Sequence, residues 1–322
     1  MALFEVEHLK KHFPVYDGFF KRQVGAFKAV NDVSFSIEAG ETFGLVGESG
    51  CGKTTVGKSV LRLIEPTSGV VRLEGNDITA MNKEQLRQQR QKMQIIFQDP
   101  YSALNPRMNV RSLISEPLLE HKLLEKNKTV INDRVAEILK KVGLNPQDMH
   151  KYPHEFSGGQ RQRIMIARAL ALHPKLIVCD EPVSALDVSV QAQILNLMQD
   201  LQDEYGISYL FIAHGMPVVQ HISKRIGVMY LGNLVEVADS DEIFYHAAHP
   251  YTKALMASIP NPDPDQPNDF NVVRGEVPNL IDPPPGCLFS NRCPYCTEEC
   301  KKSRPELKEI SPGHQVACHC VK

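Results

Sequence analysis

A glycine-rich loop near the N-terminus constrains the fold of this chain more than any other feature. The residues GESGCGKT at positions 47–54 follow an apolar stretch at 42–46 and precede a helix-like stretch that extends to about Ile64. They fit the pattern G-x-x-x-x-G-K-[ST], in which small residues let backbone N–H groups converge on phosphate oxygens at a helix N-terminus. We expect Lys53 to reach the β- and γ-phosphates of a nucleotide and Thr54 to bind Mg²⁺. The pattern therefore predicts a strand, a phosphate-binding loop and a helix of an α/β protein.

A second apolar stretch ends in two carboxylates. Residues 176–179 read LIVC, an uninterrupted apolar run typical of a strand that is covered on both faces, and Asp180 and Glu181 follow it. Ligands of α/β sheets bind at the carboxyl ends of strands, where these two side chains emerge. We expect Asp180 to hold Mg²⁺ through water and Glu181 to take or orient the proton of an attacking water.

The first 260 residues alternate strand-like and helix-like stretches, whereas the last sixty do not. Residues 101–151 lose the strand pattern and show helical spacing of apolar residues, and 188–205 are typical of an amphipathic helix. Further strands are expected at 70–73, 93–97, 208–213, 225–230 and 234–237, the last two joined by a hairpin turn at 231–233. The pattern predicts a three-layer α/β core with an inserted helical segment, followed by a proline-rich boundary at 261–285.

Composition excludes several classes of protein. With 42% hydrophobic and 23% charged residues the chain is globular rather than disordered. A net charge of −2, from 36 basic and 38 acidic residues, gives no reason to expect nucleic acid as a partner. No apolar run approaches the ~20 residues of a spanning helix, and residues 1–11 lack the apolar core of a secretory signal. We therefore expect the cytosol, where thiols stay reduced and the eight cysteines are metal ligands or core residues rather than disulfides.

Three further motifs bear on the same chemistry. The residues FSGGQ at 156–160 open a helix-like run and would expose a second set of backbone amides to an anion. One ATP has no use for two γ-phosphate sites, at 47–54 and 156–160, on the same chain. The two sites are therefore expected to act across a dimer. The residues SALD at 184–187 follow the carboxylate pair, and His214 follows the strand that ends near Ala213, where it is a candidate contact for the γ-phosphate.

With these motifs in this order, the chain resembles the ATP-binding subunits of ABC transporters over essentially its whole length. Positions 47–54 resemble the Walker A loop, 176–181 the Walker B strand, 157–160 the ABC signature and 184–187 the D-loop, while Gln98 matches the Q-loop and His214 the switch histidine. Two departures are Phe156 where Leu is commoner, and Gly215-Met216 after His214 where an Asp usually follows.

The resemblance implies two ATP-binding subunits that close head to tail around two ATP molecules. Glu181 would be the general base, His214 would steady the γ-phosphate, and Gln98 would complete the Mg²⁺ and water shell with Thr54 and Asp180. Phe13 would stack on adenine, with Tyr16 as the second candidate. The remaining ATP contacts implied are Gly47, Ser49, Gly50, Cys51, Gly52, Lys53, Thr54 and Thr55 on one subunit, and Ser157, Gly159, Gln160 and Asp187 on the other.

Other segments resemble the oligopeptide and dipeptide importers within that family. They are QDPYSALNPR at 98–107, HFP at 12–14, the insertion Phe19–Arg22 and HPY at 249–251. In that subfamily the residues just after Gln98 meet a cytoplasmic helix of the membrane subunit. The insertion is either a solvated loop or a contact with lipid headgroups.

Six of the eight cysteines lie in the tail. Taken alone, C-x₅-C-x₂-C-x₃-C is a set of soft ligands that suits zinc or an iron–sulfur cluster. The resemblance to peptide-importer subunits implies a [4Fe–4S] cluster on Cys287, Cys293, Cys300 and Cys318, with zinc as the alternative and Cys296 and Cys320 outside the pattern.

The expected architecture is thus an α/β chain with an ABC-type P-loop ATPase core at 1–260, which includes an antiparallel β subdomain and an inserted helical subdomain at about 100–170. A linker and a Cys-rich metal-binding domain follow at 261–322. The expected function is a Mg-dependent ATPase at the cytoplasmic face of the membrane, partnered by a second ATP-binding subunit, integral membrane subunits and, indirectly, an extracytoplasmic peptide-binding protein. The alternatives are an ATPase module of a soluble enzyme complex and a redox-sensing regulator.

Overall fold

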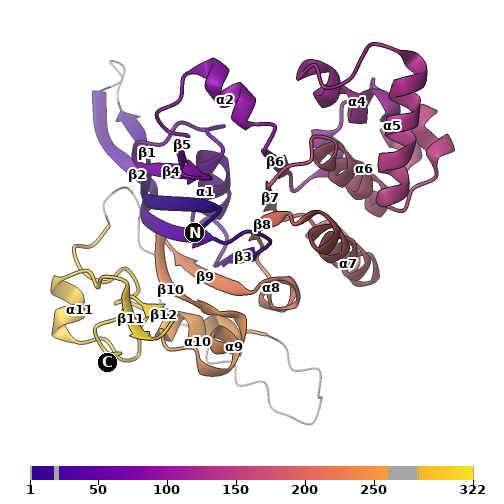
Figure 1. Cartoon of the computed structure of the whole chain (residues 1–322). Coiled ribbons are helices and arrows are strands. Elements are labelled where there is room, and N and C mark those ends of the chain that lie inside the picture. The colour runs from indigo at the N-terminus through magenta and orange to yellow at the C-terminus, as the bar shows by residue number, and fades with distance from the viewer. Residues whose placement is uncertain (1, 18–21, 260–280, 282, 322) are drawn as a thin grey trace, which may run out of the picture. The chain divides into compact units, whose positions relative to one another are not determined.

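The computed structural model describes residues 2–17, 22–259, 281 and 283–321 (Figure 1). Residues 19–21 of the insertion, and residues 261–280 and 282 of the proline-rich segment, lie outside the described residues. The chain divides into two compact units. The first comprises Met1–Ile37, Thr42–Thr79 and Ile212–Lys322, and the second comprises Glu38–Glu41 and Ala80–Phe211.

An antiparallel sheet forms one part of the first unit, as the resemblance implied. Its strands are β1 (Phe4–Asp17), β2 (Arg22–Ile37), β4 (Ser68–Leu73) and β5 (Asn76–Asp77), in the order β2-β1-β4-β5. Alternate residues at the start of β1, Phe4 and Val6, are buried, as the two-residue period of a strand with one covered face requires.

The first unit also holds β3 (Thr42–Val46), β9 (Arg225–Tyr230), β10 (Asn233–Asp239), β11 (Lys308–Ser311) and β12 (His314–Val316), in the order β11-β12-β10-β9-β3. The pair β3–β9 is parallel, and the other pairs are antiparallel. The predicted hairpin is confirmed, since β9 and β10 are joined by Leu231 (φ 44°) and Gly232 (φ 81°). Two successive residues with positive φ match the right-handed twist of the strands they connect.

Five helices belong to the described part of this unit: α1 (Lys53–Val60), α8 (Met216–Ile222), α9 (Ser240–His246), α10 (Pro250–Ala257) and α11 (Glu298–Lys302). The expected end of α1 at about Ile64 is wrong, because Arg62 adopts a left-handed conformation (φ 48°) and the N–H of Leu63 bonds back to Lys58 O at 2.9 Å. This is a common way to end a helix, and apolar periodicity that continues beyond it hides the stop from sequence reading.

The second unit holds three strands and the inserted helices. The strands β6 (Met93–Ile96), β7 (Leu176–Asp180) and β8 (Ser208–Ile212) follow the order β8-β7-β6, and every residue of β7 and β8 is buried. The helical elements are α2 (Lys83–Gln89), α3 (Pro100–Ala103), α4 (Val110–Glu120), α5 (Lys128–Lys141), the 3₁₀ turns η1 (Pro146–His150) and η2 (Pro153–Glu155), α6 (Gly158–Leu170) and α7 (Val188–Tyr205). Helices α4, α5 and α6 pack against one another in Figure 1. Within the described ranges, no helix combines the length and apolarity that a membrane crossing needs.

Candidate active site

The loop at 47–54 connects β3 to α1, and its glycines are required by the backbone around them. Gly47 has φ 150° and Gly52 has φ 106°, and a Cβ on either would lie 2.1 Å from a backbone oxygen, that of Met229 or Ala29 respectively. Gly52 is the N-cap residue of α1 and provides no side-chain cap to the first turn. The loop therefore has the tight turn, directly before a helix N-terminus, that phosphate binding needs.

Lys53 is buried at the centre of this loop, with 4% of its surface exposed. Its Nζ donates to Gly47 O (2.7 Å) and Glu48 O (3.0 Å), and it lies 3.3 Å from Nδ1 of His214. The two residues are 161 positions apart in the chain and lie in contact, while their role as γ-phosphate contacts stays a prediction. Nζ also lies 3.7 Å from Sγ of Cys51, so Lys53 contacts the loop through two carbonyls and a sulfur.

Cys51 lies in the phosphate loop, and Cys179 lies in β7. Both are buried, and burial raises the pKa of each thiol despite the Lys53 ammonium near Cys51. The carbonyl of Cys51 accepts a hydrogen bond from Gly232 N at 2.8 Å.

The carboxylate pair belongs to the second unit. Asp180 and Glu181 are 4% and 5% exposed, and Glu181 has the left-handed φ of 51° immediately after β7. Nε2 of Gln98 donates to Oε2 of Glu181 at 2.7 Å. Backbone strain of this kind persists where surrounding contacts hold it, here through Ser184, whose Oγ donates to Glu181 O at 3.1 Å. The structure therefore joins two of the three predicted catalytic residues directly.

The signature and D-loop residues lie next to each other in the same unit. Ser157 caps α6 in a capping box with Gln160, and Asp187 caps α7, where it accepts from Ser189 Oγ (2.7 Å) and Val190 N (3.0 Å). These bonds lower the pKa of Asp187. A Cβ on Gly159 would lie 2.5 Å from Cγ1 of Val190, so this glycine also permits the close approach of α6 to α7.

Phe13 and Tyr16 lie on β1 with exposed rings, 36% and 56% accessible. Lys11 Nζ lies 4.9 Å from the centre of the Phe13 ring. Each ring is accessible to a ligand, and stacking on adenine stays a prediction for both.

The four tail cysteines predicted as cluster ligands lie close together. Cys287, Cys293, Cys300 and Cys318 line one small pocket together with Cys320, whereas Cys296 does not line it. Burial raises the pKa of Cys287 to about 11, so that thiol is protonated as the structure stands. All eight cysteines are free thiols. Among the described residues, no group of three or more His, Cys, Asp or Glu side chains is arranged to hold a metal ion.

Sequence reading missed the residues that contact the phosphate loop from the C-terminal side. Glu48 pairs with Arg292 at 3.0 Å, and the N–H of Glu48 donates to the hydroxyl of Tyr251 at 2.9 Å. The sequence offered one signal for these contacts. Arg292 lies within the cysteine-rich tail, and Tyr251 lies within the HPY motif at 249–251. Neither motif by itself indicates what it touches.

Two known families match the sequence. The family described as ABC transporter matches residues 30–184, and the family described as oligopeptide/dipeptide transporter, C-terminal region, matches residues 235–300.

Among similar proteins of Bacillus subtilis (strain 168), the oligopeptide transport ATP-binding protein AppF is 49% identical over 99% of this chain and 97% of its own length. The putative oligopeptide transport ATP-binding protein YkfD is 52% identical over 100% of this chain and 96% of its own length.

Solved structures show the same kind of fold. The ATP-binding cassette MJ0796, in a dimeric post-hydrolysis state bound to ADP and Pi, aligns with a TM-score of 0.65 and 26% identity over 74% of this chain and 98% of that one. The protein cbiO1 of Clostridium perfringens, part of the ABC transporter complex cbiONQ, aligns with a TM-score of 0.64 and 25% identity over 76% and 91% of the two chains.

Proposed function

The chain belongs to the ATP-binding proteins of ABC-type oligopeptide transporters, and from that premise we propose that it binds and hydrolyses ATP to power the import of dipeptides or oligopeptides. The match of residues 235–300 to the transporter C-terminal region favours this role over that of an ATPase module in a soluble enzyme complex. The contact that carries the catalytic part of the proposal is the 2.7 Å hydrogen bond from Gln98 to Glu181.

On the first unit, the phosphate loop and Lys53 would bind the β- and γ-phosphates. Backbone N–H groups of the loop and the first turn of α1 are directed by Gly47 and Gly52, whose conformations no other residue adopts without strain. His214 contacts Lys53 at 3.3 Å and would reach the same phosphate oxygens. The hydroxyl of Thr54, the residue after Lys53, would bind Mg²⁺.

On the second unit, Glu181 would act as general base toward the attacking water. It accepts a hydrogen bond from Gln98, an amide that can orient the carboxylate and a water at once. Asp180 would hold Mg²⁺ through water. Magnesium supplies charge neutralisation of the phosphates when it is bound.

We propose that the chain works as one half of a pair, with a second copy or a similar chain as its partner. Ser157 and Gln160 at the start of α6 are exposed, and so is Asp187 at the start of α7. Val188, next to Asp187, is 81% exposed, and a partner that contacts Asp187 would cover it. The signature residues would then contact the ATP that the partner's phosphate loop holds, and membrane subunits would anchor the pair at the cytoplasmic face.

We further propose that Cys287, Cys293, Cys300 and Cys318 bind an iron–sulfur cluster. The support is the donor set, four thiols around one pocket, and the thiolates would have to form as the metal binds. Cys320 lines the same pocket and is the substitute ligand. Stoichiometric iron and sulfide, with broad visible absorption in protein prepared without oxygen, would support the cluster, whereas colourless protein with zinc would assign zinc.

Capture from membranes tests the transport role. Tagged chain, isolated from detergent-solubilised membranes, should carry integral membrane subunits with it, and a peptide with its binding protein should stimulate ATP hydrolysis by the isolated complex. A Lys53→Ala variant should recover the same membrane subunits without hydrolysis. Recovery of the wild-type chain only with enzymes that lack membrane segments would refute import.

A further inference from the structure

The C-terminal segment makes a two-pronged ion pair with the phosphate loop. Arg292 donates from Nη1 to Oε2 and from Nη2 to Oε1 of Glu48, both at 3.0 Å, and its side chain is only 9% exposed. Both residues belong to the first unit. Bidentate guanidinium–carboxylate pairs fix geometry as well as charge, and such a pair with one buried partner is screened less than a surface pair.

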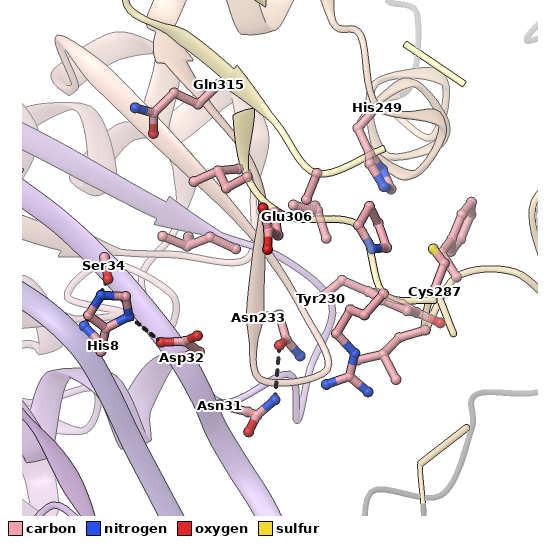
Figure 2. A pocket seen from close by; sticks show the side chains of 18 of the residues that line it. His8, Asn31, Asp32, Ser34, Tyr230, Asn233, His249, Cys287, Glu306 and Gln315 are labelled. Atoms are coloured by element: carbon pink, nitrogen blue, oxygen red, sulfur yellow. Dashed lines mark hydrogen bonds and ion pairs between the residues drawn. The ribbon is translucent and has the colours of Figure 1, made fainter. Parts of the chain in front are cut away.

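An aromatic cluster fixes Arg292 in place. The ring centre of Phe289 lies 5.4 Å from that of Tyr230 and 5.5 Å from that of Tyr251. Arg292 also donates to the hydroxyl of Tyr230 at 3.3 Å, and Tyr251 accepts the N–H of Glu48 at 2.9 Å. The same cluster therefore contacts the phosphate loop directly through Tyr251 and holds Arg292, which pairs with the loop, through Tyr230. Tyr230 and His249 line a pocket that Cys287 of the C-terminal segment also lines (Figure 2).

The turn that carries Arg292 begins and ends at two of the tail cysteines. Ser290 N donates to Cys287 O at 3.1 Å, Arg292 N donates to Phe289 O at 2.9 Å, and Cys293 follows. Cys287 N in turn donates to Cys300 O at 2.7 Å. The position of the guanidinium is thus set by a short, hydrogen-bonded turn rather than by a free loop.

The charge of Glu48 is the reason that this contact matters for the loop. Glu48 is the second residue of an anion-binding loop, and an unpaired carboxylate there would repel the phosphates of ATP. A bidentate guanidinium cancels that charge and holds the side chain toward the C-terminal segment, while Tyr251 fixes the backbone at the same residue. We propose that Arg292 is a positioning residue for ATP binding, which acts by neutralising and orienting Glu48. The proposed role of Arg292 rests on the ATP-binding role of the loop. It depends neither on peptide import nor on a metal in the tail.

Calorimetric titration of the full-length chain with Mg-ATP tests the proposal. Arg292→Gln should weaken ATP binding about tenfold, because the charge it leaves uncompensated near the loop costs on the order of 1 kcal/mol. In steady-state hydrolysis the loss should appear in KM, with kcat within about twofold of the wild type. Arg292→Lys keeps the charge but not the bidentate geometry, so its affinity for ATP should lie between those of the wild type and Arg292→Gln.

Two further variants separate this role from a general loosening of the segment. Adding Glu48→Gln to Arg292→Gln removes the unpaired carboxylate and should recover at least about threefold of the lost affinity. Arg304→Gln is the matched control, an arginine of the same segment whose guanidinium donates to Pro284 O rather than to the loop. It should bind ATP as the wild type does. Equal losses in Arg292→Gln and Arg304→Gln, or no recovery in the double variant, would overturn the proposal.

Discussion

Replacing Phe289 by Ala should detach the Cys287–Cys293 turn from the phosphate loop. Phe289 is 2% exposed and packs on the rings of Tyr230, Tyr251 and His249. Burial of a Phe side chain contributes about 1.5–3 kcal/mol, and ring pairs add roughly 0.5–1.5 kcal/mol each. The expected cost is about 3–5 kcal/mol, which is the range observed when buried Phe is truncated to Ala.

Hydrogen exchange measures this cost where it arises. The amides of Ser290 and Arg292 donate within the turn, to Cys287 O and Phe289 O. If the turn opens locally, a loss of about 3–5 kcal/mol speeds their exchange by roughly two to three and a half orders of magnitude. Phe289→Leu, which conserves most of the volume, should cost less than about 1.5 kcal/mol and speed exchange tenfold or less. Unchanged exchange in Phe289→Ala would refute the view that this ring holds the turn in place.

Two further predictions concern protonation and the loop. Burial lowers the pKa of His249 to about 4. Between that pH and about 6.5, the pKa of an unfolded histidine, the folded chain therefore binds fewer protons than the unfolded chain. The free energy of unfolding should fall by about 3 kcal/mol as the pH drops through this window. His249→Asn keeps an acceptor for Tyr251 N at the start of α10 and should flatten this part of the denaturant-unfolding profile; equal pH slopes in both proteins would contradict the assignment. Gly52→Ala should lower the free energy of unfolding by at least about 2 kcal/mol more than Gly50→Ala does. The reason is that, of these two positions, only at 52 would the new Cβ meet a backbone oxygen. Equal melting temperatures of the two variants would contradict this prediction.

Patterns that are local in sequence predicted the fold well. The strands at 42–46 and 176–179 and the helix at 188–205 rest on apolar periodicity and coincide with β3, β7 and α7. The end of α1 was missed because a left-handed Arg62, bonded through its guanidinium to Ile78 O, stops the helix while the apolar spacing continues.

Contacts between distant segments were predicted only where a motif names both partners. Lys53 with His214 and Gln98 with Glu181 were expected to share a ligand, and each pair is in contact. Arg292 with Glu48 was not expected, because no local pattern records which carboxylate an arginine 244 residues away will face. The expected metal site rested on cysteine spacing and on the resemblance to peptide-importer subunits. Spacing brings the thiols to one pocket but does not by itself create the arrangement of a metal centre among the described residues.

Hydrolysis of ATP by a Glu181→Gln variant tests the central claim most directly. The substitution keeps the size of the side chain and removes the carboxylate that Gln98 contacts. We predict that turnover falls by at least about a hundredfold while Mg-ATP still binds. The control is Glu204→Gln, which replaces an exposed carboxylate on α7 and should retain wild-type turnover. Turnover in Glu181→Gln equal to that of the wild type would contradict the assigned base and, with it, the proposed mechanism of ATP hydrolysis.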